Sequence, residues 1–174
     1  KSINWNIDLY EGIDLSIFLF GSFQSEITDS IVKFISRKKK LRYNIIDIGS
    51  NIGDKSLTLT HKLLKNNINN FKIYSIEPTD FAYDKQIKNL DLNPKLKKKI
   101  SIFKSFISTK KKIPYSTYSS WNLKPKKNHH KVHGGILKGI NKKTKISTLD
   151  SFIKNNKIKN NVILKIDTDG HEME

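Results

Sequence analysis

The sequence contains no cysteine in 174 residues, so disulfide bonds and thiolate zinc sites are excluded. It also lacks an apolar run near the roughly 20 residues that a membrane-spanning helix needs. The longest candidate, 13–23, is interrupted by Asp14, Ser16 and Gly21. Nothing at the start has the pattern of a secretory signal. With 36% hydrophobic residues in regular blocks, the chain is expected to be a folded cytoplasmic protein.

Arginine is scarce, with two residues against 31 lysines, although the formal net charge is +17. A charge of this size normally indicates nucleic acid or an anionic membrane as a partner. Sites that read bases favour arginine, however, because its planar group binds guanine and phosphate through two hydrogen bonds. The lysine clusters fall between apolar blocks, where loops and helix ends are expected (38–40, 97–99, 110–112 and 142–145). A solvated basic surface is therefore favoured over a nucleic-acid groove.

Short apolar blocks alternate with segments of helical periodicity, and this alternation predicts an α/β fold. The block 44–49 is dense in apolar residues and stops at a glycine, as a buried parallel strand should. Further strands are predicted over 71–76, 100–103 with an extension toward Ile107, and 162–167. Helices are predicted over 13–19, 27–37, 53–65, 79–90 with Thr79 as the cap, and 148–153.

The order of these elements indicates a doubly wound, mostly parallel sheet with right-handed crossovers. We divide the chain into a helical lead-in over 1–40 and a ligand-binding domain over 41–174.

The segment 108–147 has poor periodicity and is expected to leave the core as a long loop. His129, His130 and His133 lie in it, but no fourth ligand is recognisable and no cysteine is available, so no metal site is predicted. The segment 119–121 (SSW) is a candidate part of a substrate pocket. Packing of the loop onto the core explains its tryptophan equally well.

A glycine-rich turn, Asp47–Asp54 (DIGSNIGD), lies directly between a predicted strand and a predicted helix. Glycine lets the backbone approach a ligand closely, and a helix N-terminus offers unpaired N–H groups to an anionic group. The spacing is G-x-x-x-G, whereas a dinucleotide site has G-x-G-x-x-G to hold a pyrophosphate. The carboxylate of a bound methionine moiety would meet these requirements.

Glu77 ends the next predicted strand, thirty positions after Asp47. In doubly wound nucleotide-binding folds a carboxylate at this place accepts hydrogen bonds from ribose hydroxyls. The simpler alternative is that Gly49 only permits a turn and Glu77 only caps the following helix. The order of strand, turn, helix, strand and acid favours a cofactor site.

Five segments resemble the FkbM family of class I S-adenosylmethionine-dependent methyltransferases in order and spacing: 44–54 (NIIDIGSNIGD), 75–78 (SIEP), 89–93 (NLDLN), 148–153 (TLDSFI) and 164–172 (LKIDTDGHE). The segment Trp5–Gly21 also resembles the region before the first strand in relatives. The resemblance implies a Rossmann-like fold. It also implies transfer of a methyl group from S-adenosylmethionine to a hydroxyl oxygen of a saccharide, polyketide or related small metabolite.

The resemblance also implies a set of cofactor-binding residues. Four of them would line the methionine end of the cofactor: Asp47, Gly49, Asn51 and Gly53. Glu77 would hold the ribose. The segment Lys104–Phe106, through Ser105 and Phe106, would approach the adenine.

A hydroxyl acceptor must lose a proton during methyl transfer, and a nearby carboxylate or histidine can take it. Asp167 is the best-placed candidate, because it ends the strand expected beside the glycine-turn strand. His171 and Glu172 follow it and are candidates to assist. Asp169 stands where the family more often has glutamate, so its reach is shorter. Alternatively, residues 169–172 turn the chain and cap a new helix.

The family fold has seven strands, and this chain reaches the fourth. The strand 162–166 is therefore expected at an exposed parallel edge despite its apolar composition, and we expect the chain to be part of a longer protein. Two alternative functions stay open. One is an RNA methyltransferase, favoured by charge but lacking an N-P-P-Y-type motif. The other is a non-catalytic cofactor-binding module.

Overall fold

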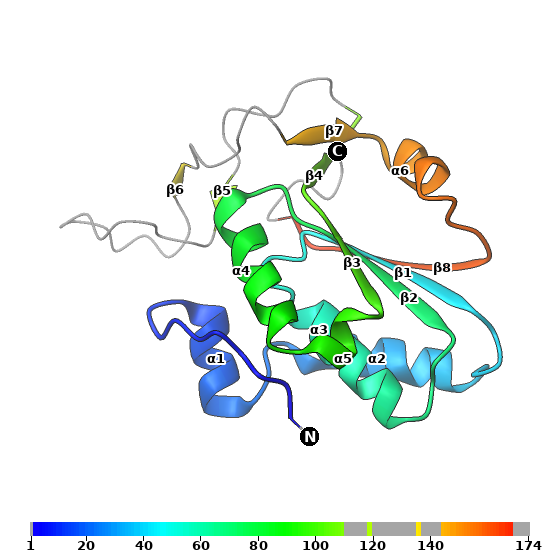
Figure 1. Cartoon of the computed structure of the whole chain (residues 1–174), viewed down its shortest axis with the longest axis horizontal. Helices are drawn as coiled ribbons and strands as arrows, with labels where there is room; N and C mark the ends of the chain where they lie inside the picture. The colour runs from blue at the N-terminus through cyan, green and yellow to red at the C-terminus, as the bar shows by residue number, and fades with distance from the viewer. Residues whose placement is uncertain (1, 110–117, 120–134, 137–143, 169–174) are drawn as a thin grey trace.

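The computed structural model describes residues 2–109, 118–119, 135–136 and 144–168 (Figure 1). Predictions that concern His129, His130, His133 and residues 120–121 and 169–172 lie outside this part. Six helices are described: α1 (Gly12–Phe20), α2 (Ser25–Ser36), α3 (Asp54–Lys65), α4 (Asp80–Asp91), α5 (Pro94–Lys97) and α6 (Leu149–Asn155). No helix in the described part is long and apolar enough to cross a membrane.

A parallel four-stranded sheet forms the centre of the molecule. Its order is β3 (Ile100–Phe103), β2 (Phe71–Ile76), β1 (Tyr43–Ile48) and β8 (Asn161–Ile166). In β1 every residue is buried, because strands cover both its edges and helices cover both its faces. The predicted α/β fold with a doubly wound parallel sheet is confirmed.

The two faces of the sheet carry separate apolar cores. On one face, Ile35 of α2 and Leu57 and Leu63 of α3 pack on Ile45 and Ile73 of the central strands. On the other, Phe152 of α6 packs with Ile46, Tyr74 and Ile76. Figure 1 shows α2, α3 and α5 on one side of the strands and α6 on the other. Neighbouring residues of a strand alternate between the two cores, as the pleat requires.

The N-terminal segment, including α1, is held against α4 and the residues that follow it. Asn6 N–H donates to Asn89 Oδ1 over 2.9 Å, and Asn4 N–H donates to Asn93 Oδ1 over 2.9 Å. Asp14 of α1 forms a buried ion pair with Lys85. The segment 89–93 (NLDLN) therefore holds the start of the chain through its two asparagine side chains.

Two predictions about local structure are wrong. The strand predicted to run on from Phe103 toward Ile107 is divided at Lys104, and β4 (Ser105–Ile107) pairs with β7 (Lys145–Ser147) in a separate parallel pair. Thr79 is the residue before α4, but its hydroxyl forms no cap; it donates to Glu77 Oε1 over 2.5 Å. A further short pair joins β5 (Tyr118–Ser119) and β6 (Gly135–Ile136). Both small pairs depend on long-range contacts that have no local sequence pattern.

Candidate functional site

The glycine turn is tied to both neighbours of β1 at the carboxyl ends of the strands. The N–H groups of Gly49 and Ser50 both donate to Ile76 O of β2 over 3.0 Å. On the other side, Asp167 N–H donates to Ile48 O over 3.1 Å. In open α/β sheets, ligands bind in the crevice outside these carboxyl ends. The backbone of the turn is therefore fixed at the place where such folds hold ligands.

Gly49 is required by both its conformation and its surroundings. Its φ is +72°, in the left-handed region that residues with a Cβ rarely adopt. A Cβ built there would lie 1.8 Å from Asp167 O, which is much closer than two non-bonded atoms can approach. The chain leaving β8 passes directly over this glycine. Gly49 is therefore required by the packing of the protein's own chain, and the predicted approach to a ligand stays a prediction.

Two further residues of the turn adopt the same unusual conformation. Asn51 has φ +49° and Gly53 has φ +82°, just before α3 begins at Asp54. Asparagine is among the few residues that tolerate this region, so its presence here has a conformational reason. A Cβ on Gly53 would meet the Gln86 side chain at 2.8 Å.

Glu77 and the glycine turn are in direct contact. Glu77 Oε2 accepts a hydrogen bond from Asn51 N–H over 2.9 Å. Its Oε1 accepts from Thr79 N–H over 2.9 Å and from the Thr79 hydroxyl. Gly49 and Glu77 therefore lie on the same side of the molecule, as a shared cofactor site requires.

Burial changes the proton affinity of this carboxyl group. Glu77 is 5% exposed, and loss of solvation raises its pKa above the ordinary 4.5, against the opposing effect of the hydrogen bonds from Thr79 and Asn51. Asp54, at the start of α3, also has a pKa raised by burial, with Lys55 at 2.7 Å acting in the opposite direction. Two acids with raised pKa values thus flank the turn.

A chain of buried polar side chains supports the turn from below. Ser50 Oγ donates to Gln86 Oε1 over 3.2 Å, and the Gln86 amide donates to Ser75 Oγ. The hydroxyls of Ser75 and Ser56 lie 3.0 Å apart, and Ser56 donates to Asp47 Oδ2 over 2.8 Å. All five are at most 3% exposed. Sequence reasoning assigned no role to Ser56 and Gln86, because isolated polar residues in helices carry no motif of their own. Ser75 lies in the segment 75–78 that resembles the family, but no function was assigned to its side chain.

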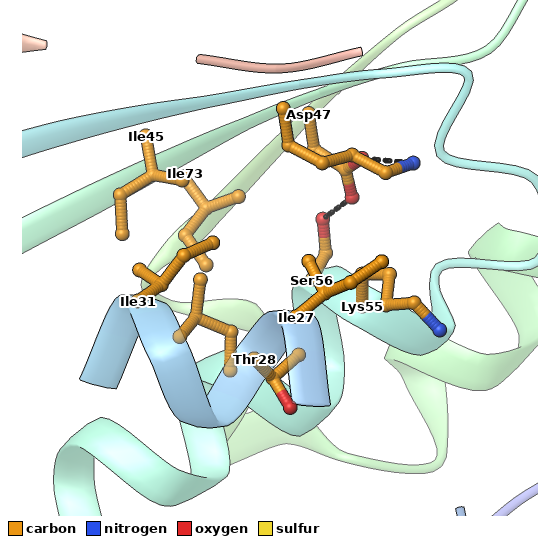
Figure 2. Close-up of a pocket in the computed structure, with 10 residues that line it drawn as sticks. Ile27, Thr28, Ile31, Ile45, Asp47, Lys55, Ser56 and Ile73 are labelled. Atoms are coloured by element: carbon orange, nitrogen blue, oxygen red, sulfur yellow. Dashed lines mark hydrogen bonds and ion pairs between the residues drawn. The ribbon is translucent and has the colours of Figure 1, made fainter. Parts of the chain in front are cut away.

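Both oxygens of Asp47 are engaged by protein groups. Oδ2 accepts from Ser56, and Oδ1 forms an ion pair with Lys165 Nζ at 3.0 Å. Figure 2 shows the Asp47 carboxylate directed toward Ser56, above a hollow between α2 and the strands. This hollow holds no more than about one water molecule, so it is too small for a cofactor. In this structure, then, Asp47 stabilises the turn through its side chain.

Asp167 has an exposed side chain, at 51%. It directly follows β8, and its Oδ2 lies 3.7 Å from Lys165 Nζ. It is therefore adjacent to Gly49, to the end of β1 and to solvent. The candidates expected to assist it, His171 and Glu172, lie outside the described residues.

The segment Lys104–Phe106 lies immediately beyond Glu77. Glu77 N–H donates to Phe103 O over 3.0 Å, which brings the end of β3 beside the acid. Ser105 and Phe106 are both 7% exposed, and Ser105 Oγ donates to Lys145 O over 3.0 Å. Lys104 pairs with Asp80 of α4. The three segments assigned to the methionine, ribose and adenine thus follow one another along one end of the sheet.

Within the described residues, no group of three or more histidine and acidic side chains is arranged so that it could bind a metal ion.

Comparisons with known proteins bear on this arrangement. A family model described as the methyltransferase FkbM domain matches residues 47–174. Among solved structures, a chain titled human methyltransferase 10 domain containing protein is similar, at 18% identity and a TM-score of 0.35. The match covers 59% of the present chain and 45% of that one, so the chain spans less than half of that structure's length. A search of curated proteins gives no match.

Proposed function

Since the chain belongs to the FkbM methyltransferase family, we propose that it binds S-adenosylmethionine at the glycine turn and methylates a hydroxyl oxygen of a saccharide or other small metabolite. The observation that supports this most directly is the hydrogen bond between Asn51 N–H and Glu77 Oε2. It joins the turn and the acid that the proposal assigns to one ligand.

The residues at the methionine end suit a ligand with a carboxylate. Gly49 and Gly53 present backbone without side chains, and the turn leads into the N-terminus of α3. The N-terminus of a twelve-residue helix carries a partial positive charge that favours an anionic group. The supporting polar chain from Ser50 to Asp47 keeps this backbone in place before any ligand arrives.

The ribose end can accept one hydroxyl directly. A carboxylate has about four acceptor positions, and Glu77 uses three of them for Asn51 N–H and the two groups of Thr79. With the described residues alone as donors, one position is left for a ribose hydroxyl. A second hydroxyl bond requires the Thr79 hydroxyl to rotate away from Oε1.

The chemistry divides between the cofactor and the protein. S-adenosylmethionine, when bound, supplies a methyl group already activated on a sulfonium sulfur. The protein then has to align the acceptor oxygen and take its proton. We assign the second task to Asp167, whose half-exposed carboxylate directly follows β8 at the crevice end of the sheet.

Calorimetric titration with S-adenosylmethionine tests cofactor binding. We expect heat from the wild type, and an affinity about ten- to a hundred-fold weaker for Glu77→Ala, because a hydrogen-bonding charge is removed. Glu26→Ala, which removes an exposed glutamate from α2, is the matched control. Thermal melts of each variant, and Glu77→Gln as a variant of similar shape, separate lost binding from lost folding. No heat from the folded wild type would end the cofactor proposal.

Asp167→Asn tests the assigned proton acceptor. We expect S-adenosylmethionine binding to stay within about twofold while release of the demethylated cofactor product, with a panel of hydroxyl acceptors, falls about a hundred-fold or more. Retained binding in both proteins, with no product from either on any acceptor, would instead favour a non-catalytic cofactor-binding module.

A further inference from the structure

Lys165 is a cation with a largely buried side chain in an otherwise apolar stretch of β8. Its side chain is 9% exposed, whereas lysine is rarely buried unless it is paired. Removing an ammonium group from water is costly, so the surrounding groups have to compensate for it. This residue plays no part in the roles assigned above, and its partners show what it does.

Three acceptors surround the Lys165 ammonium group, and each belongs to a different part of the site. Asp47 Oδ1, at the end of β1, lies 3.0 Å away. Gly49 O, in the glycine turn, accepts a hydrogen bond over 3.1 Å. Asp167 Oδ2, just after β8, lies 3.7 Å away. Asp47 Oδ1 and Gly49 O thus lie within hydrogen-bond distance of the ammonium group, whereas Asp167 interacts with it as a longer ion pair.

The charges around Lys165 keep it protonated. Burial lowers its pKa, but the carboxylates of Asp47, Asp167 and Asp54 together outweigh burial and raise the pKa above its ordinary value. The cation is therefore present throughout the pH range in which the protein would work.

The peptide group between Gly49 and Ser50 is held by two hydrogen bonds, one at its C=O and one at its N–H. In a trans peptide the C=O and the following N–H point in opposite directions. The N–H of Ser50 donates to Ile76 O of β2, while the C=O of Gly49 accepts from Lys165 of β8. The peptide between these two residues is thus anchored to the strand on each side of β1.

We propose that Lys165 is a positioning residue, which sets the orientation of the Gly49–Ser50 peptide for cofactor binding and holds the Asp167 carboxylate at the crevice. The first part of this role deepens the proposed function and rests on it. A single apolar substitution here removes the donor to Gly49 and leaves Asp47 buried without its cation.

Amide hydrogen exchange tests the positioning without any ligand. In Lys165→Met we expect the Ser50 amide to exchange at least about tenfold faster than in the wild type, relative to the Tyr74 amide in the centre of the sheet. Lys165→Arg keeps the charge and the donors and should restore most of the protection. Lys154→Met, on the exposed side of α6, is the matched control. Unchanged Ser50 exchange in Lys165→Met would overturn the proposal.

Titration with S-adenosylmethionine, combined with a double variant, separates positioning from general stability. In Asp47→Asn/Lys165→Met both charges are gone, so we expect the melting temperature to recover toward that of the wild type. The affinity should stay about ten- to a hundred-fold weak, because Gly49 O still lacks its donor. Recovery of affinity together with stability would mean that the lysine only neutralises Asp47, and would refute the positioning role.

The two tests fail independently. If the folded wild type gives no heat with S-adenosylmethionine, the proposed function fails and the role of Lys165 toward the cofactor fails with it. Faster Ser50 exchange in Lys165→Met would in that case still support its control of the turn.

Discussion

At the scale of single residues, the site depends on backbone conformations that few side chains allow. Gly49, Asn51 and Gly53 all have positive φ within five positions. At Gly49 the limit is also steric, because the chain leaving β8 occupies the space that a side chain would need. The fold itself therefore requires glycine at position 49, whether or not a ligand binds.

Gly49→Ala should destabilise the protein and weaken cofactor binding together. A left-handed conformation costs a non-glycine residue about 1–2 kcal/mol, and displacement of Asp167 O adds to this, so we expect a loss of at least about 2 kcal/mol in unfolding free energy. Gly12→Ala is the control, because a Cβ there meets nothing within 4 Å and φ is not positive. Chemical denaturation measures the unfolding free energy of the two variants. Equal stability of Gly49→Ala and Gly12→Ala would contradict the steric explanation.

The raised pKa of Glu77 predicts a pH dependence of stability. The folded protein holds the proton more tightly than the unfolded chain, so the unfolding free energy should fall as pH rises from about 4.5 through the raised pKa. Glu77→Gln removes this contribution. The stability of the wild type relative to Glu77→Gln should therefore decline across that range, by about 1.4 kcal/mol for each pKa unit of difference.

Denaturation curves at a series of pH values measure this decline. Asp54 has a raised pKa in the wild type, but it is present in both proteins and largely cancels in the comparison. Parallel stability curves for the two proteins would show that burial does not raise the pKa of Glu77.

At the scale of elements, α4 connects the N-terminal segment to the glycine turn. Asn89, which is fully buried, accepts from Asn6 N–H over 2.9 Å and donates to Ile52 O of the turn over 3.0 Å. Nearby, Ile17 of α1 packs with Ile52 and Ala82. The lead-in is thus attached both to the helix and to the backbone that the proposal assigns to the cofactor.

Asn89→Ala should loosen this attachment. Loss of this side chain leaves Asn6 N–H without its acceptor and the buried Ile52 O without its donor, at a cost of about 1–3 kcal/mol. We expect faster proteolytic cleavage within residues 2–11 as well as lower stability. Asn70→Ala, at an exposed position, should change neither. Intact protection of the N-terminal segment in Asn89→Ala would show that α1 packing alone retains it.

At the scale of the whole molecule, β8 is an edge strand of the sheet in the part of the chain that the structure describes. Val162, Leu164 and Ile166 are each 41% exposed on the face that carries α6 over the central strands (Figure 1). No described strand pairs with the outer edge of β8. The expected exposed parallel edge is confirmed in the described part of the chain. Such an edge is open to pairing with another chain.

Leu164→Lys should therefore reduce self-association. A charge on an edge strand opposes edge-to-edge pairing, and we expect sedimentation velocity to show a larger monomer fraction than for the wild type. Leu92→Lys, at a position 44% exposed but outside the sheet, is the matched control. A monomeric wild type with a cooperative melt would show that the edge is not a site of association.

The local patterns of the sequence determined the central sheet, most of the helices and the two motifs of the site. Dense apolar blocks predict 44–49, 71–76 and 162–167 as strands to within one residue at each end of β1, β2 and β8. The reason is that strands buried on both faces need continuous apolar residues. Glycine spacing and an acid after the second strand identified the turn and Glu77, since each is a local requirement.

Only the tertiary structure decided which side chains support that turn. The partners of Asp47 are Ser56, nine positions away, and Lys165, 118 positions away. Asn89 joins Asn6 of the lead-in to Ile52 of the turn through contacts across the fold. Likewise, Lys104 ends one strand so that β4 can pair with β7, forty residues later. These outcomes depend on which charges and donors meet in a buried space, and that is set by packing rather than by neighbours in the sequence.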